Sequence, residues 1–199
     1  MAATFAGFPP EALEFLRQLK RHNNREWFLK NKAAYEAKVK APMVDLVLAL
    51  GREMKPFAPE MITDPARAIY RIYRDTRFSP DKTPYKTHVA AVFKPRNMEK
   101  HNCAGLYFHV APEFRRLFGE LWGAKLTRAP KGFPADHPAA ELLRYKQMLA
   151  DVSHPARLAE TPKLLPTIVD LFRGMMPLLR FLNAPLAGQL RDRPIHLED

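Results

Sequence analysis

The order of the hydrophobic patterns along the chain constrains its fold more than any other feature. Apolar residues recur at helical spacing over residues 10–55, gather in β-branched and aromatic runs over residues 68–122, and return to helical spacing after residue 138. Helices followed by strands and then by helices are typical of an α+β domain. We therefore predict a small, mainly antiparallel sheet packed with N-terminal and C-terminal helices.

The length and composition of the chain fit one folded domain. A chain of 199 residues with 47% hydrophobic residues can bury a core without covalent staples. The single cysteine, Cys103, excludes an intramolecular disulfide. We find no basic leader before an apolar run and no apolar stretch long enough to span a bilayer, which predicts a cytoplasmic protein. We expect residues 1–190 to form the domain and residues 191–199 to form a polar C-terminal tail.

The helix boundaries are marked most clearly near the N-terminus. Pro9-Pro10 followed by Glu11 predicts a helix start, and the apolar face continues to about Arg21. Asn24 is expected to cap a second helix. Further helices are expected over residues 43–55, 138–145, 164–172 and 175–182.

Strands are expected where β-branched and aromatic residues gather. The run AIYRIY, residues 68–73, is the first predicted strand. Connections of only a few residues favour antiparallel pairing. Further strands are expected over residues 88–93, 106–110, 114–122 and 148–152.

The segment over residues 67–88, RAIYRIYRDTRFSPDKTPYKTH, concentrates positive charge. Between Arg67 and Lys86 there are six basic residues and two acidic ones, interleaved with aromatic rings. Alternate side chains of a strand share a face, and Ser79-Pro80-Asp81 is expected to reverse the chain. One face then carries Arg71, Tyr73, Asp75 and Arg77, the other carries Tyr70, Ile72 and Arg74, and the reversal brings Lys82 and Tyr85 back toward the arginines.

Two interpretations of this segment stay open. The first is an anion site, because guanidinium groups bind phosphate or carboxylate in a bidentate manner and Lys82 adds a point charge. Tyr85 could donate a hydrogen bond there, or act as an acid if its pKa were lowered. The second is an internal salt-bridge network in which Asp75 pairs with Arg71 and Arg77 while the tyrosines pack in the core.

The same segment resembles the signature of a bacterial family known as domain of unknown function 2461. The family pattern is R-x-x-R-D-x-R-F-x-x-x-K-x-x-Y, and its fixed positions are filled here by Arg71, Arg74, Asp75, Arg77, Phe78, Lys82 and Tyr85. NNREWFLKNKAAYE, residues 23–36, is similar to the family's N-x-x-x-W-F segment. GFPADHPA, residues 132–139, is similar to its proline-rich loop.

The resemblance covers most of the chain and implies a cytosolic α+β domain of roughly 200 residues. It implies no activity, because none is established for the family. It does imply that a function would sit between Arg71 and Tyr85. A family pattern that fixes arginines, an aspartate, a lysine and a tyrosine together specifies polar geometry.

The net charge of +11 supports a further alternative, a nucleic-acid-binding module. Residues 17–40 carry a basic surplus together with Trp27, Phe28 and Tyr35, which could stack on bases. The same pattern also fits an amphipathic helix with solvated lysines. Only a continuous basic face would favour nucleic acid.

We expect neither a cofactor nor a metal, because the spacing of His101, Cys103 and His109 fits no zinc pattern. The expected function is binding of a small phosphate- or carboxylate-bearing ligand, with or without turnover. A structural or interaction domain and a nucleic-acid-binding module are the alternatives. No membrane partner is expected, and no catalytic residue is assigned. The candidate ligand-binding residues are Arg71, Arg74, Asp75, Arg77, Lys82, Tyr85 and Trp27.

Overall fold

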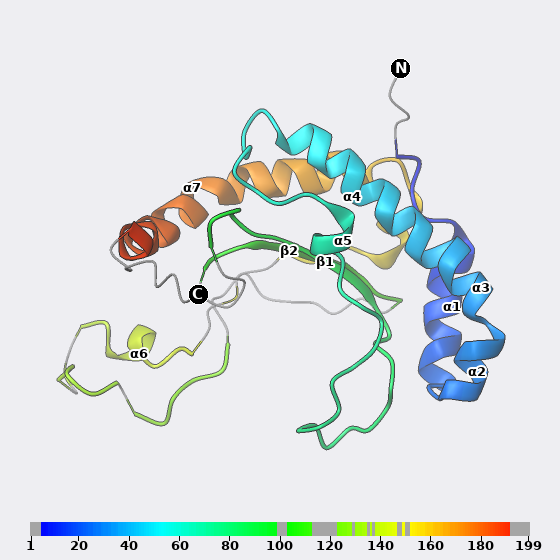
Figure 1. The fold of residues 1–199 in the computed structure, drawn as a ribbon, viewed down its shortest axis with the longest axis horizontal. Helices are drawn as coiled ribbons and strands as arrows, with labels where there is room; N and C mark the ends of the chain where they lie inside the picture. Colours follow the sequence, from blue (N-terminus) through cyan, green and yellow to red (C-terminus); the bar gives the residue numbers. More distant parts are fainter. Residues whose placement is uncertain are drawn as a thin grey trace, which may run out of the picture. The chain divides into compact units, whose positions relative to one another are not determined.

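A computed structural model of the chain has the predicted α+β architecture (Figure 1). It describes residues 5–98, 103–112, 123–128, 130–134, 136, 138–146, 149 and 152–191, with side chains as far as residue 186. The chain forms two compact units, Met1–Glu113 together with Ala156–Asp199, and Phe114–Pro155. The described helices are α1 (Pro10–Arg21), α2 (Arg25–Lys30), α3 (Lys32–Tyr35), the π-helix η1 (Glu36–Lys40), α4 (Ala41–Met54), α5 (Pro65–Ala68), α6 (Ala140–Leu143), the 3₁₀ helix η2 (Ala156–Glu160) and α7 (Leu164–Arg191), and the strands are β1 (Val89–Phe93) and β2 (Leu106–Val110).

The first helices begin where the sequence predicts. Pro10 and Glu11 lie in the first turn of α1, where a missing N–H costs nothing and a carboxylate suits the helix dipole. The Asn24 side chain accepts a hydrogen bond from the backbone N–H of Trp27 and so caps α2. Helix α4 covers the predicted 43–55 helix, starting two residues earlier and ending one earlier.

The sheet consists of the antiparallel strands β1 and β2, with Val89 opposite Val110 and Phe93 opposite Leu106. Period-two alternation gives it two faces. The inner face carries Val89, Ala91, Phe93, Leu106, Phe108 and Val110, and the outer face carries Ala90, Val92, Tyr107 and His109. Figure 1 shows α4 and α7 on one side of this sheet. Phe172 of α7 packs edge-on against Phe93, at 5.7 Å between ring centroids, which fixes the inner face as the covered one.

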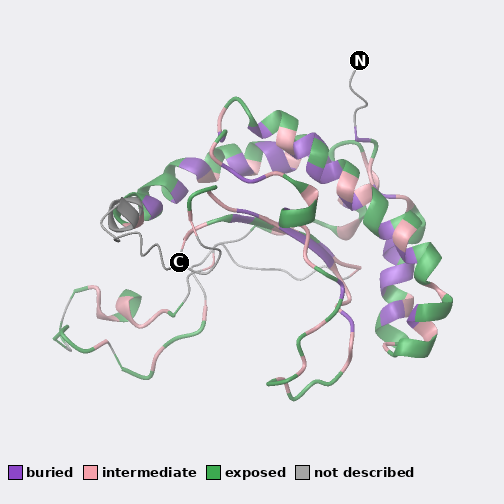
Figure 2. Ribbon diagram, in the orientation of Figure 1, coloured by how far each residue is buried: buried purple, intermediate pink, exposed green. Residues whose placement is uncertain are grey.

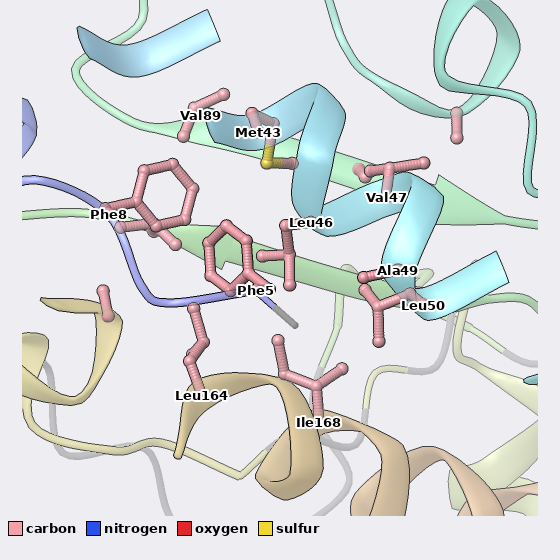
Figure 3. Close-up of a cluster of buried hydrophobic side chains, with 14 of the residues drawn as sticks. Phe5, Phe8, Met43, Leu46, Val47, Ala49, Leu50, Val89, Leu164 and Ile168 are labelled. Atoms are coloured by element: carbon pink, nitrogen blue, oxygen red, sulfur yellow. The ribbon is translucent and has the colours of Figure 1, made fainter. Parts of the chain in front are cut away.

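The core lies between α1, α4, α7 and the inner face of the sheet. The buried positions of these helices face inward, as Figure 2 shows, and Figure 3 shows side chains from α4, α7, β1 and the N-terminal segment meeting there. Gly7 lets the N-terminal segment approach η2, because its φ is +110° and an added Cβ would lie 2.7 Å from the carbonyl carbon of Glu160. The backbone N–H of Phe8 then donates to the carbonyl of Ala159 at 2.7 Å.

The C-terminal helix corrects one prediction. The sequence predicted separate helices over residues 164–172 and 175–182, but α7 is continuous and contains Pro177 and Pro185. Packing against the core compensates for the backbone hydrogen bonds that these prolines remove. Among the described residues, no helix combines the length and apolar character needed to cross a membrane.

The predicted strand over residues 68–73 is also wrong. Ala68 ends the short helix α5, which Asp64 caps by accepting from the backbone N–H of Ala66. The following residues make only isolated bridges, Ile69 with Ala91 and Tyr73 with Tyr85. Asp64 and Pro65 start a short helix, and its last residue, Ala68, is also the first residue of the β-branched and aromatic run that indicated a strand. The chain then runs beside β1 without forming a ladder.

The second unit has little regular structure among its described residues. Helix α6 is shorter than the predicted 138–145 helix. Backbone hydrogen bonds join Leu126 to Arg144 and Lys146 to Ala124 around a bridge between Lys125 and Tyr145. The strand predicted over residues 114–122 lies outside the described residues, as do most of the one predicted over residues 148–152 and the tail after Arg191.

Candidate functional site

The arginine loop, which we define as residues 70–88, is a reversed segment anchored at its base. The backbone N–H of Arg74 donates to the carbonyl of Pro84 at 2.9 Å, and that of Lys86 donates to the carbonyl of Ile72 at 2.8 Å. The chain therefore doubles back as the sequence predicts. The tightest turn is at Arg77 and Phe78, slightly earlier than the expected Ser79-Pro80-Asp81 turn.

The N-terminal helices hold the base of the arginine loop through two contacts with Tyr85. The Asn23 side chain donates to the carbonyl of Tyr85 at 2.9 Å and accepts from its backbone N–H at 3.0 Å. The Phe28 ring stacks on the Tyr85 ring at 4.2 Å between centroids. Tyr85 is consequently buried, and burial raises the pKa of its phenol. Tyr85 therefore remains a neutral packing residue.

Arg77, at the loop tip, forms a bidentate ion pair with Asp75. Nε of Arg77 donates to Oδ1 of Asp75 at 3.0 Å, and Nη2 donates to Oδ2 at 2.7 Å. These hydrogen bonds lower the pKa of Asp75 to about 2. The Arg77 side chain is 76% exposed and that of Asp75 is 45% exposed, so this pair is not part of a buried salt-bridge network.

Arg74 makes a second ion pair, closer to the base of the loop. Its Nη1 donates to Asp81 and, at 2.6 Å, to the hydroxyl of Thr83. The backbone N–H of Thr83 also donates to Asp81, and with Arg74 it lowers the pKa of this carboxyl to about 2. The two loop carboxylates thus have different arginine partners, which the predicted sharing of Asp75 by Arg71 and Arg77 did not anticipate.

The two loop lysines occupy different places. Lys82 reaches the carbonyl of Thr76 at 2.9 Å and stays within the loop tip. Lys86 reaches the carbonyl of Arg71 at 2.6 Å, and its Nζ lies 5.3 Å from the centroid of the Tyr70 ring.

An open hollow of about 380 Å³ lies at the base of the arginine loop. Two cations, Arg74 and Lys86, contribute to its lining. Asp75 is its one lining carboxylate, and Arg77 already binds this group through both oxygens. The lining residues are Arg74, Asp75, Tyr85, Lys86, Thr87 and His88.

His88 is uncharged at neutral pH. Burial is the main cause that lowers the pKa of His88, to about 4. The neighbouring His109, and after it the positive charges of Lys86 and Arg74, act in the same direction. The imidazole therefore offers the hollow a neutral ring rather than a third cation.

Metal and thiol chemistry have little support among the residues that the structure describes. No three His, Cys, Asp or Glu side chains gather there in a metal-binding arrangement. Burial raises the pKa of the Cys103 thiol, which disfavours the reactive thiolate.

A family model described as "Conserved hypothetical protein (DUF2461)" matches residues 11–114 and 110–181. The chain belongs to the DUF2461 family. No curated protein and no solved structure matches it significantly. The match covers both compact units, and it includes α1, the arginine loop, the sheet and most of α7.

In this DUF2461 protein the residues that we singled out from the sequence separate into three groups. Arg74, Asp75 and Tyr85 line the hollow. Arg71, Arg77 and Lys82 are exposed on the loop outside its lining. Trp27 lies apart, in ring contact with Phe15 and His22, while its neighbour Phe28 reaches the loop.

Sequence reasoning missed Asn23, Lys86, Thr87 and His88 as residues of the site. Asn23 and Phe28 both belong to the N-x-x-x-W-F segment, so the two family segments meet at Tyr85. Their joint presence in the family pattern was the available signal. Lys86 enters the sequence argument only as charge, and the candidate ligand-binding residues did not include His88.

Proposed function

We propose that this DUF2461 protein binds a small phosphate- or carboxylate-bearing ligand in the hollow at the base of the arginine loop. The proposal rests on one observation. Arg74 and Lys86 both line the hollow, whereas its single lining carboxylate, Asp75, is neutralised by Arg77. The lining itself has one more positive than negative side chain, and the partners of Asp75 and Arg74, which are Arg77 and Asp81, lie outside it. This excess of positive charge attracts anions.

The donors of Arg74 support this assignment. A guanidinium carries five N–H donors in a fixed plane. The described side-chain hydrogen bonds of Arg74 use Nη1, and they hold the group in place against Asp81 and Thr83. Nε and Nη2 can then donate to a phosphate or carboxylate, and Lys86 adds a second positive charge.

The location of the ion pairs also favours a ligand site over a structural network. A network that holds helices to a sheet requires buried charges. Here the Arg77 side chain is 76% exposed and that of Asp81 is 53% exposed. The proposal includes a cytosolic location, where phosphorylated metabolites are abundant, and does not include turnover.

Calorimetric titration with inorganic phosphate, pyrophosphate and citrate tests the proposal. We expect at least one of these anions to bind, with affinity that falls at least about tenfold in Lys86→Ala, because a charge-assisted hydrogen bond is lost. Lys163→Ala removes an exposed lysine far along the sequence and controls for net charge. If Lys82→Ala weakens binding while Lys86→Ala does not, the anion binds at the loop tip and the proposed site is wrong.

A further inference from the structure

Three aromatic side chains lie together on the outer face of the sheet, and we call them the aromatic arc: Tyr70, Tyr107 and His109. The rings of Tyr70 and Tyr107 are 6.2 Å apart between centroids, and those of Tyr107 and His109 are 5.6 Å apart. The backbone N–H of Tyr70 donates to the carbonyl of Ala90, which places Tyr70 alongside β1. Tyr107 and His109 come from β2, on the other side of β1.

Both ends of the aromatic arc meet residues that line the hollow. At one end, Nζ of Lys86 lies 5.3 Å from the centroid of the Tyr70 ring. At the other end, the rings of His88 and His109 are 5.5 Å apart. The cationic hollow and the aromatic arc are therefore adjacent parts of one surface.

The aromatic arc is accessible although its residues are large. Tyr107 remains 46% exposed, and His109 is exposed as well. Their cross-strand partners on the outer face are Val92 and Ala90, which are too small to cover the rings. Tyr107 and His109 are two residues apart on β2, so their exposed rings lie on one face of the sheet, where a planar ring can pack against them.

We propose that the ligand is a nucleotide, with its phosphate held by Arg74 and Lys86 and its base stacked on Tyr107 and His109. This inference rests on the proposed anion site and names its ligand class. A simple phosphate would use the hollow alone and leave the aromatic arc unused. Stacking of one base on an aromatic side chain strengthens binding roughly tenfold to hundredfold.

The neutral state of His88 agrees with this assignment. His88 lines the hollow together with Lys86 and Arg74, and its ring lies 5.5 Å from that of His109. Because its imidazole is uncharged, His88 adds no positive charge where the cationic hollow borders the aromatic arc. A nucleotide likewise changes from a charged phosphate to an uncharged base.

The test compares inorganic phosphate, ribose 5-phosphate and adenosine monophosphate by calorimetry on the full chain. We expect adenosine monophosphate to bind at least about tenfold more tightly than ribose 5-phosphate, because only the former carries a base. Equal affinities of these two ligands, with phosphate binding that still depends on Lys86, would overturn the nucleotide assignment and leave the anion site standing. Absence of binding by all three would overturn both.

Variants of Tyr107 locate the stacking. Tyr107→Leu keeps apolar bulk on the strand, and Tyr107→Phe keeps the ring. We expect Tyr107→Leu to bring adenosine monophosphate to the affinity of ribose 5-phosphate, with the latter unchanged, and Tyr107→Phe to retain most of the difference. Phe181→Ala, which removes a 75% exposed ring from α7, serves as the matched control. If Tyr107→Leu behaves like Phe181→Ala, the base does not stack on this strand and the proposal is wrong.

A short single-stranded oligonucleotide distinguishes the two sources of the same nucleotide chemistry. If a five-nucleotide strand binds more tightly than the mononucleotide, and its affinity falls steeply with added salt, the ligand is a single-stranded nucleic acid with one nucleotide in the site. Tighter binding of the mononucleotide assigns it to a free metabolite. Dependence on both Lys86 and Tyr107 is expected in either case, and its absence for both ligands would contradict the proposal.

Discussion

Arg77 binds both oxygens of Asp75, yet this pair stands in solvent on the arginine loop. Exposed ion pairs contribute little to folding, because water screens the charges and two side chains lose rotamer freedom. Arg77→Ala should therefore leave the urea midpoint close to that of Arg173→Ala on α7, because each change removes one exposed ion pair and one cation–π contact. Equilibrium unfolding followed by circular dichroism measures this. A loss several times larger than in Arg173→Ala would indicate a structural network.

The pKa of His88 predicts a pH dependence of stability. Burial lowers this pKa to about 4 in the folded protein, whereas an unfolded histidine titrates near 6.5. As the pH falls through 6.5, the unfolded chain takes up the proton before the folded protein does. The contribution of His88 to stability is therefore fully present above about pH 6.5 and is lost as the pH falls from 6.5 to 4. Relative to His88→Gln, the wild type should lose on the order of 2 kcal/mol of unfolding free energy between pH 7 and 4.5.

Urea unfolding of both proteins at several pH values measures the difference, and the other histidines cancel in the comparison. Histidine nitrogen shifts followed by NMR provide an independent reading. A His88 that titrates near pH 6.5 in the folded protein would contradict the prediction.

At the residue scale, the sequence predicted which side chains of the arginine loop are exposed better than it predicted which of them form ion pairs. Alternation holds, because Arg71 and Tyr73 are exposed while Ile72 between them is buried. The ion pairs follow only in part: Asp75 pairs with Arg77 as expected, but the pairing of Arg74 with Asp81 was not predicted. Alternation is a local property of an extended chain, whereas pairing depends on where the loop closes.

Two asparagine side chains join elements of the fold in the same manner. Asn23 donates to and accepts from the backbone of Tyr85, and Asn183 of α7 does the same with Ala104, at 3.0 Å and 2.8 Å. Each amide takes the place of a neighbouring strand residue. Such clamps satisfy backbone groups that no ladder reaches, because the arginine loop and the approach to β2 lack regular partners.

Removal of the Asn23 clamp should destabilise the protein. In Asn23→Ala the backbone N–H and carbonyl of the buried Tyr85 lose their partners, which costs about 1–3 kcal/mol of unfolding free energy. Asn31→Ala is the matched control, because its side chain donates only to the carbonyl of Trp27 within the same helical region. Urea unfolding compares the two. Equal effects in the two variants would show that the clamp does not hold the loop.

The elements themselves were predictable to different degrees. Capping and patterning located α1, α2 and α4, and β-branched runs located β1 and β2, because these signals are local. The run AIYRIY has strand composition but follows a capped turn of helix and bridges β1 only at Ile69. Helix α7 continues through the break that the sequence predicted at residues 173–174, because tertiary packing overrides this local signal. Asn183, just beyond the predicted 175–182 helix, is buried within α7 and binds the backbone of Ala104.

On the scale of the molecule, the described core belongs to one unit. Every residue of the buried apolar cluster comes from Met1–Glu113 or Ala156–Asp199, and none from Phe114–Pro155, among the residues described. The hollow and the aromatic arc belong to the same unit. The second unit is therefore an insertion between β2 and η2 that contributes no described residue to this core.

This organisation predicts that the insertion is dispensable for folding. A chain in which a Gly/Ser linker of about 12 residues, spanning roughly 20 Å, replaces residues 114–155 should unfold cooperatively with a midpoint within about 5 °C of the full chain. It should also bind phosphate with unchanged affinity, because Arg74 and Lys86 remain. Thermal unfolding and calorimetry measure both. A chain that has lost its cooperative transition would show that residues 114–155 complete the core. The excised segment, close to the size of about 40 residues below which domains need staples, should show no cooperative transition of its own.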